Sequence, residues 1–274
     1  MSLFISSINS GSNANCYYVG NIKEAVLIDA GVSCRETETR MNRLGLSMKR
    51  VKAIFISHEH GDHIAGLRSL IKKYPVPVYI TPETMREGKV SLREGLIHTF
   101  LPHESISIGD LTITPFPKFH DASDPHSFIV QHQQVKVGVI TDIGIACENV
   151  TRYFKQCHAA FLESNYDEHM LETGRYPLAL KNRIRGGKGH ISNRQALELF
   201  SNHAPSFMSH LILSHLSFHN NTPSIVQNLF KQHAGQTKII IASRKEASEV
   251  YHIENTVGTN GKTKPVLASQ LSLF

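Results

Sequence analysis

The sequence is poor in cysteine, in long apolar runs and in the features of a secretory signal. Its 274 residues include only 4 cysteines, and none has the CxxC spacing of metal sites, which excludes a disulfide framework and a Cys-rich metal site. No run of about 18 apolar residues occurs, so we expect no membrane span. The N-terminus has no basic segment before its apolar stretch, so a secretory signal is not expected either. These absences predict a cytoplasmic protein with reduced thiols and no membrane partner.

The rest of the composition is that of a globular protein with a basic surface. Charged residues make up 19% of the chain and hydrophobic residues 41%, a balance that excludes disorder of the whole chain. The net charge of +6 favours an acidic partner such as nucleic acid, although a merely soluble basic protein would carry the same charge. The 17 histidines matter because histidine is a leading metal ligand.

Apolar periodicity predicts strands that alternate with helices in two similar halves. Strands are expected at 16–20, 25–31, 51–56, 75–80, several within 105–142, 211–216 and 238–243, and helices at 34–46, 65–74, 150–156, 193–202 and 224–232. Two strand-rich halves, each covered by helices, make a layered α/β sandwich. We expect one domain over 1–253, followed over 254–274 by a polar tail that lacks periodicity.

The strongest chemical signal is the segment SHEHGDH at 57–63, which follows the apolar run VKAIFI. Its four metal-ligand side chains are His58, His60, Asp62 and His63. They cannot all lie on one helix face, but on a tight loop they can converge. Imidazole suits zinc and related transition metals, and carboxylate adds charge and a hard oxygen. A polar loop with chance histidines is the alternative; the interleaved acid and the preceding buried strand favour a metal site.

Four further polar residues stand at the ends of apolar strands: Asp29, His120, Asp142 and His215. One such residue alone is usually a cap or a turn residue. With the histidine cluster, the same placement occurs five times in this chain. That recurrence favours a single site at one edge of the sheets.

The segment HEHGDH resembles the HxHxDH signature of the metallo-β-lactamase superfamily, and the resemblance extends over about residues 3–250. It implies an αββα sandwich with two divalent metal ions, zinc or manganese, with iron also accepted by such ligands. The implied ligands are His58, His60 and His120 for one ion and Asp62, His63 and His215 for the other. Asp142 would bridge the ions, and Asp29 would orient ligands from behind. Asp62 also counts among the implied catalytic residues.

Two other segments resemble motifs of ribonuclease Z-like phosphodiesterases: FLESN at 161–165 and GHISN at 189–193. In those enzymes a Glu–His pair protonates the leaving alkoxide, which is a poor leaving group without a proton. The pair here would be Glu163 and His190. A simpler interpretation of GHISN is a helix N-cap at Ser192 or Asn193, and the two interpretations are compatible.

The segment 175–194 is basic and contains no Asp or Glu. Its predicted substrate-binding residues are Lys181, Arg183, Arg185, Lys188 and Arg194. A charge run is often only a solvated face, but this one flanks His190, which favours contact with phosphate. The stretch between Asp142 and His215 is too short for a β-CASP cap, so the small uncapped form is expected.

Within the superfamily the chain is most similar to the YycJ/WalJ family. The shared segments include SGS at 10–12, HDA at 120–122, ESN at 163–165, GHISN at 189–193 and LSHLS at 213–217. This resemblance implies a DNA exonuclease with a role in repair. Tyr166 and the pair His126-Ser127 depart from the family pattern and put the substrate in question. The alternatives are a hydrolase of a small cyclic phosphodiester, lactone or thioester, and a non-catalytic adaptor that has kept its metal site.

The chain ends in QLSLF, after a stretch rich in Asn, Thr, Gly and Lys that is typical of a flexible tether. This pentapeptide resembles the motif with which bacterial replication and repair proteins bind the DNA polymerase sliding clamp. The binding residues would be Gln270, Leu271, Leu273 and Phe274, because a few apolar anchors carry most of such an interface. The alternative is a final edge strand of the chain's own sheet.

Deleting residues 270–274 should abolish binding to the sliding clamp and leave hydrolysis of short oligonucleotides unchanged, because the peptide is separate from the predicted catalytic domain. Calorimetric titration of the clamp with the full-length and the truncated chain measures the first effect. Undiminished binding by the truncated chain, or none by the full-length chain, would contradict the prediction.

Overall fold

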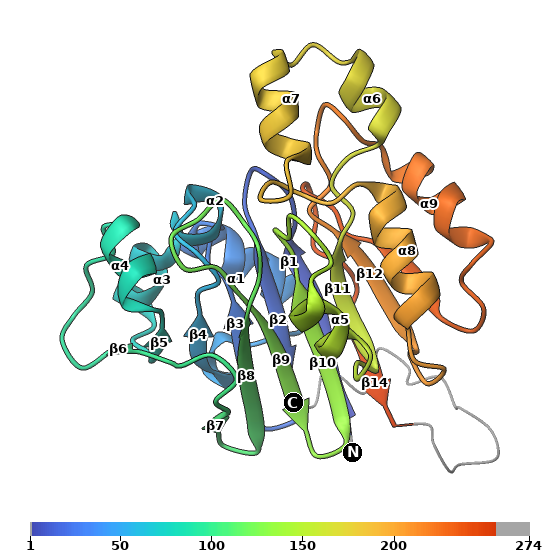
Figure 1. The fold of residues 1–274 in the computed structure, drawn as a ribbon. Helices are drawn as coiled ribbons and strands as arrows, with labels where there is room; N and C mark the ends of the chain where they lie inside the picture. The colour runs from blue at the N-terminus through green and yellow to red at the C-terminus, as the bar shows by residue number, and fades with distance from the viewer. Residues whose placement is uncertain (1, 256–274) are drawn as a thin grey trace.

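The computed structural model describes residues 2–255, which form two β-sheets stacked face to face with helices on both outer faces (Figure 1). The first sheet contains, from edge to edge, β14 (Tyr251–Glu254), β1 (Ser2–Asn9), β2 (Cys16–Gly20), β3 (Ala25–Ile28), β4 (Val51–Phe55), β5 (Val78–Tyr79) and β6 (Ile97–His98). The second contains β13 (Lys238–Ile241), β12 (His210–Ser214), β11 (Ala159–Glu163), β10 (Val135–Ile140), β9 (His126–His132), β8 (Leu111–Pro117) and β7 (Ile106–Ile108).

The helices form the two outer layers and one projection. On the side of the first sheet lie α1 (Cys34–Arg43), the 3-10 turn η1 (Met48–Arg50), α2 (Gly61–Ile64), α3 (Leu67–Lys73) and α4 (Pro82–Glu87). On the side of the second sheet lie α5 (Glu148–Phe154), α8 (Asn193–His203) and α9 (Pro223–Lys231). The two remaining helices, α6 (Glu168–Thr173) and α7 (Leu178–Arg185), form a hairpin that projects beyond one end of the sheets (Figure 1).

Three apolar clusters hold these layers together. The central cluster lies between the sheets and includes Tyr17, Phe55, Phe128 and Phe161, all fully buried. Phe55 from the first sheet meets Phe128 from the second edge to face, with 5.6 Å between ring centroids. Each outer cluster packs one sheet against its helices. Burying a side chain of this size stabilises the fold by about 1.5–3 kcal/mol, so the stacked aromatic rings contribute strongly to the contact between the sheets.

The strands that carry the predicted site residues finish at the same end of the sandwich. β3 and β4 are parallel in the first sheet, and β10, β11 and β12 are parallel in the second. Their carboxyl ends point toward α2 and the α6–α7 hairpin (Figure 1). Just beyond these ends, Asp29, Asp142 and His215 have φ angles of 63°, 54° and 57°. This left-handed conformation is uncommon outside glycine and turns the chain sharply at the end of each strand.

The predicted α/β sandwich is confirmed, and so is the absence of a cap. β2 has the bounds expected for it, and α1 begins at the expected residue. The strand expected over 25–31 ends earlier, at Ile28, because the chain turns at Asp29. Residues 143–214, all of them described, contain only α5, β11, α6, α7, α8 and β12, which leaves no room for a further domain.

Several elements were not predicted from the sequence. β11 is a central strand of only five residues, flanked by loops, and its apolar part is too short to stand out by periodicity. The α6–α7 hairpin has almost no apolar periodicity because it has little to bury: α7 contains no buried residue. Only the fold shows that the hairpin is present.

The tail expected over 254–274 begins at the last residue of β14, which pairs with β1. Gln270, Leu271, Leu273 and Phe274 lie outside the described residues. Within the part of the chain that the structure describes, no helix has both the length and the apolar character needed to cross a membrane.

Candidate metal centre

Three imidazole nitrogens converge at one end of the sandwich, between loops from the two sheets. His58 Nε2 lies 3.1 Å from His60 Nδ1, and His120 Nε2 lies 3.3 Å from the same atom. His58 follows β4, His60 precedes α2, and His120 follows β8, so both sheets contribute. Three nitrogens this close together can surround one cation such as zinc, which imidazole binds. Two of the three carry no proton, as the hydrogen bonds described below indicate.

A second group of predicted ligands lies beside the first. Asp62 Oδ2 is 3.4 Å from His63 Nε2 and 3.5 Å from His215 Nε2. Asp142 stands between the groups: its Oδ2 is 3.4 Å from His63 Nε2, and its Oδ1 is 4.0 Å from His120 Nε2. All seven predicted ligands therefore come together in one place, in two groups joined by Asp142.

Hydrogen bonds behind the histidines aim their free nitrogens into this space. Ser57 Oγ donates to Asp29 Oδ2 at 2.9 Å and therefore accepts from His58 Nδ1 at 2.8 Å. Asp29 Oδ2 also accepts from His63 Nδ1 at 2.7 Å. A proton thus sits on Nδ1 of both rings, and each Nε2 faces this space. Burial holds the pKa of His58 well below its usual range, so its Nε2 presents a lone pair. Burial also acts to lower the pKa of His63, but Asp142, Asp29 and Asp62 raise it above its usual range, so a cation would take the place of a proton on its Nε2. Asp29 occupies the orienting position predicted for it.

His120 is oriented from the other side of the site. Its Nδ1 donates to the carbonyl oxygen of Gly189 at 2.9 Å, so its Nε2 also presents a lone pair. Burial, reinforced by the nearby charges of Lys118 and His190, lowers the pKa of His120 to about 4 in spite of Asp142. A neutral imidazole is the form that binds a metal.

Two further observations indicate that this pocket suits bound cations. Among the described residues, buried Asp142 Oδ2 and His215 Nε2 have no hydrogen-bond partner, which is rare for polar atoms inside a protein. Burial by itself lowers the pKa of His215, but Asp142, Asp62 and Glu163 together raise it to about 10. The carboxylates of the pocket therefore favour positive charge at this place, whether a proton on His215 or a bound cation carries it.

His190 and Glu163 form the pair expected from the sequence. His190 Nδ1 donates to Glu163 Oε1 at 2.8 Å, which leaves His190 Nε2 free to face the pocket. The His190 ring lies between two predicted ligands, with centroids 5.2 Å from His120 and 5.2 Å from His215. Glu163 is fully buried, whereas the His190 side chain is 21% exposed. The helix-cap interpretation also holds, because Ser192 caps α8 with a complete capping box.

Glu163 has a second role that the sequence did not indicate. Its Oε1 also accepts from Nδ1 of His215 at 3.0 Å, and its Oε2 accepts from the backbone amides of Ile143 and Ile191 at 2.9 and 3.3 Å. Burial alone raises the pKa of Glu163, but the charge and hydrogen bond of His190 and the hydrogen bond of His215 lower it to about 2. One carboxylate thus orients both a predicted ligand and the predicted acid.

A cavity of about 290 Å³ opens above these residues, and the α6–α7 hairpin forms one wall of it through Tyr176, Leu180, Arg183 and Ile184. Of the five basic residues predicted to bind substrate, Arg183 lines this cavity, where it forms an ion pair with Asp121. The other four are not among the lining residues. Lys181 donates to the Glu172 carbonyl, Arg185 pairs with Glu172 at 2.7 Å and Arg194 pairs with Glu168 at 3.4 Å.

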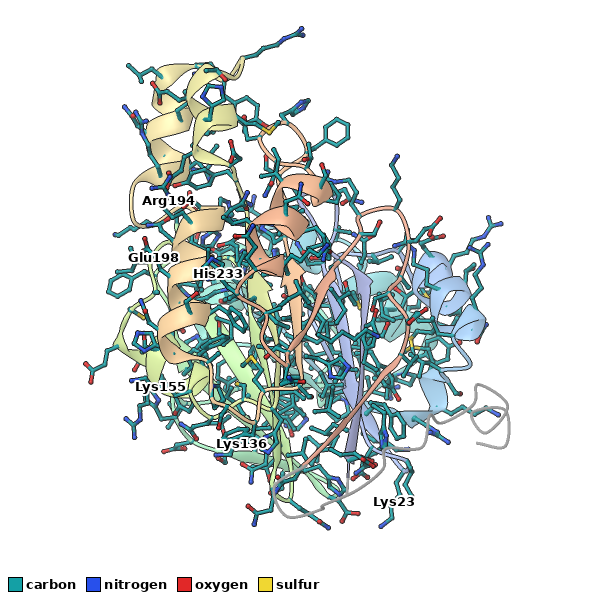
Figure 2. The ribbon with its side chains drawn as sticks, turned by 90° about the vertical axis from the view of Figure 1, so that its right-hand side faces the viewer. Lys23, Lys136, Lys155, Arg194, Glu198 and His233 are labelled. Atoms are coloured by element: carbon teal, nitrogen blue, oxygen red, sulfur yellow. The ribbon has the colours of Figure 1, made fainter. Side chains whose placement is uncertain are left out.

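The positive charge is spread over the molecule rather than concentrated at the cavity. In Figure 2, Arg194 lies toward the end that bears the α6–α7 hairpin, while Lys23 and Lys136 lie at the opposite end. Lys23 is paired with Asp110, and Lys136 donates to Gln156. Exposed charges of this kind contribute little to one particular site, so Arg183 is the basic residue that the fold favours.

Sequence reasoning missed several residues that hold the ligands. Asn15 Nδ2 lies 3.0 Å from both Asp62 Oδ2 and His63 Nε2, and Asn165 Nδ2 donates to the carbonyl of His215 at 2.8 Å. Both are asparagines in loops, and only the fold brings them to the site. Tyr166, which departs from the family pattern, is 5% exposed and is not among the residues that line the cavity.

Comparison with known proteins identifies the family of this chain. The model of the β-lactamase superfamily domain matches residues 24–215. Exodeoxyribonuclease YycJ of Bacillus anthracis is 33% identical over 232 residues, which cover 83% of this chain and 87% of that protein. Exodeoxyribonuclease WalJ of Streptococcus pneumoniae is 28% identical over 221 residues, which cover 79% and 82%. These similarities extend well beyond the metal-ligand motif.

A solved structure shares the fold of this chain. The crystal structure of the metallo-β-lactamase fold protein YhfI from Bacillus subtilis superposes with a TM-score of 0.71, covering 92% of this chain and all of that one. The two sequences are 15% identical, so the likeness is one of fold alone.

Gly31 allows the loop after β3 to approach the metal-ligand loop. Its amide donates to the Asn15 carbonyl at 2.9 Å, and the Asn15 amide donates to the Asp62 carbonyl at 2.7 Å. A Cβ on Gly31 would lie 1.7 Å from the Asp62 carbonyl oxygen. Any residue other than glycine at position 31 would therefore push the backbone at Asp62 away. Gly61, in the same ligand loop, would meet nothing within 4 Å.

Gly31→Ala should therefore lower the metal affinity by about 10–100-fold, the range for changes directly behind ligands. Gly61→Ala is the matched control and should bind like the wild type. Zinc titration of the metal-free proteins against a chelating indicator measures both, with circular dichroism to check folding. Equal affinity in the two variants would show that Gly31 does not position the ligands.

Proposed function

This chain belongs to the metallo-β-lactamase superfamily and, within it, to the family of YycJ and WalJ, and from that premise we propose that it is a metal-dependent phosphodiesterase that cleaves nucleic acid. The observation that carries the proposal is the His190–Glu163 pair beside the converging ligands. A proton donor of this kind is needed when the leaving group is an alkoxide, as it is in a phosphodiester. A thioester or an activated lactone has no comparable need for it.

Two divalent ions, held by His58, His60, Asp62, His63, His120, Asp142 and His215, would activate a water and neutralise charge on the attacked phosphate. Arg183 lines the wall of the cavity and pairs with Asp121; in the proposed complex its guanidinium would leave Asp121 and bind a phosphate oxygen of the substrate. The hairpin residues Leu180 and Ile184 would shield the reacting phosphate from bulk water on that side.

His190 would protonate the leaving oxygen through Nε2. Glu163 accepts four hydrogen bonds, two from imidazoles and two from backbone amides, so it stays ionised and holds the proton of His190 on Nδ1. A carboxylate behind the ring also stabilises the imidazolium form, the form that can donate from Nε2. The chain would thereby hold a proton donor beside the leaving group.

The finer parts of the proposal are a DNA substrate, exonucleolytic cleavage, a repair or replication role and a cytoplasmic location. The DNA substrate and the exonuclease activity are supported by the names of the relatives from Bacillus anthracis and Streptococcus pneumoniae. Binding to the sliding clamp is supported by the sequence QLSLF at 270–274. Together these features describe an enzyme whose residues 270–274 would bind the sliding clamp and thereby recruit it to replicating DNA.

Incubation of the manganese- or zinc-loaded chain with end-labelled single- and double-stranded DNA and RNA tests the proposal directly. We expect stepwise shortening of DNA, and loss of about 10²–10³-fold in rate for His60→Ala, because one ion loses a ligand and with it several kcal/mol of charge stabilisation. Circular dichroism shows whether the variant is folded. Absence of cleavage of every strand by the metal-loaded wild type, or full activity of folded His60→Ala, would refute a metal-dependent nuclease.

His190→Ala should slow cleavage of DNA by about 10²–10⁴-fold, the usual contribution of general acid catalysis. Its metal content should not change, because the ligands are other residues. A nitrophenyl phosphodiester, whose leaving group needs little protonation, should lose much less rate. Equal slowing of both substrates would mean that His190 positions the substrate and does not protonate it.

A further inference from the structure

A second cavity of about 380 Å³ lies next to the proposed metal centre. It is formed by the loops that follow β12 and β13, the parallel neighbours at the end of the second sheet. Ser217 lines both cavities, and Ser10, which lines the second, accepts a hydrogen bond from the His215 amide at 2.8 Å. The two cavities are therefore adjacent, and the proposed mechanism uses only the first.

An aromatic ring and a cation form the outer part of this second cavity. Phe218 is 62% exposed, so its ring is open to contact with a ligand. The guanidinium of Arg244 lies over the ring, with Cζ 5.0 Å from its centroid. Arg244 is held there because its Nη2 donates to the Leu216 carbonyl at 2.6 Å, while its own carbonyl accepts from Asn13.

The ring continues a row of aromatic side chains that starts at the first cavity. Tyr176 lines the metal cavity and lies 5.8 Å from the ring of His219. The His219 ring in turn lies 4.8 Å from that of Phe218. Tyr176, His219, Phe218 and Arg244 thus form a continuous surface from the proposed cleavage site to the second cavity. We call this surface the aromatic row.

We propose that the aromatic row is a binding site for unpaired nucleobases, which holds a single strand while one of its phosphates lies at the metal centre. The inference rests on the proposed nuclease function and names the part of the substrate that the second cavity takes. A flat base can stack on Phe218, and the phosphates of the strand can form ion pairs with Arg244 and Lys245, which line the same cavity.

The chemistry of the cavity favours a nucleic-acid strand over an apolar peptide. Its lining mixes apolar surface, such as Pro223 and Ile241, with the hydroxyl of Ser243 and two cations, and it has no acidic residue. Alternating π-faces and positive charges are the usual means of binding single strands without sequence preference. A base-paired duplex would keep its bases stacked on one another and could not use the row, so the site favours unpaired ends.

The test compares two short strands of equal length and charge: an oligothymidylate and a strand of abasic tetrahydrofuran residues. The full chain, loaded with manganese, should have a KM for the thymidylate about ten-fold or more below that for the abasic strand, the size of effect that base stacking gives. Phe218→Ala should remove most of that difference. Phe218→Trp should keep it, and Phe218→Leu, which is apolar but has no π-face, should not.

Ile22→Ala is the matched control, because Ile22 is also exposed, at 54%, but lies in the turn between β2 and β3 at the opposite end of the strands. It should behave like the wild type on both strands. The inference would be overturned if the Phe218→Ala variant kept the full wild-type preference for the base-bearing strand. It would also be overturned by a wild-type chain that cleaves both strands with the same KM.

Fluorescence anisotropy with the same labelled strands separates failure of this inference from failure of the proposed function. Binding of the thymidylate that depends on Phe218 supports the row even if no strand is cleaved. Cleavage by the wild type together with binding that Phe218→Ala leaves unchanged contradicts the row and leaves the nuclease function standing.

Discussion

Asp29 and Glu163 are buried carboxylates, one at a strand end in each sheet, and the geometry of the site depends on keeping both of them satisfied. A buried charge without partners costs several kcal/mol, so each must collect hydrogen-bond donors from the surrounding loops. Asp29 collects the amide and hydroxyl of Ser57 and the imidazole of His63. Glu163 collects two backbone amides and the imidazoles of His190 and His215. The hydrogen bonds to these two carboxylates fix the surrounding loops. In the resulting arrangement the nitrogens of the predicted ligands point inward.

The same constraint explains why the backbone accepts strain at this edge. Left-handed residues other than glycine cost of order 1–3 kcal/mol each, and Asp29, Asp142 and His215 all have that conformation. The surrounding contacts hold them there: the Asp29 amide donates to the Phe55 carbonyl, and the His215 amide donates to Ser10 from the other sheet. The bond from His215 to Ser10 also ties the two sheets together next to the metal centre. At this edge the left-handed residues are therefore ones whose side chains reach over the end of a strand.

The parts of the site that we propose to select a substrate are built differently from the parts that we propose to do the chemistry. Asp142, His215 and Glu163 stand at strand ends and are buried, while His60, Asp62 and His63 stand on the tight turn into α2 that follows β4. Tyr176, Arg183 and the aromatic row stand on the α6–α7 hairpin and on surface loops that bury little. A rigid centre combined with loosely supported walls lets relatives of one fold act on different substrates, because loops can change without disturbing the ligands.

The sequence by itself was enough to predict the sandwich, the metal-ligand set and the His190–Glu163 pair. Each prediction rests on a local pattern: apolar runs of strand length, polar residues at the ends of those runs, or short motifs that resemble a known family. It could not show that Glu163 also holds His215, that Arg183 alone of the basic residues lines the cavity, or that Tyr176, His219, Phe218 and Arg244 form one surface. Those facts depend on contacts between residues far apart in the chain. Such contacts come from the stacking of two sheets, and the tertiary structure alone decides them, because no local periodicity encodes which loops meet at the end of a sandwich.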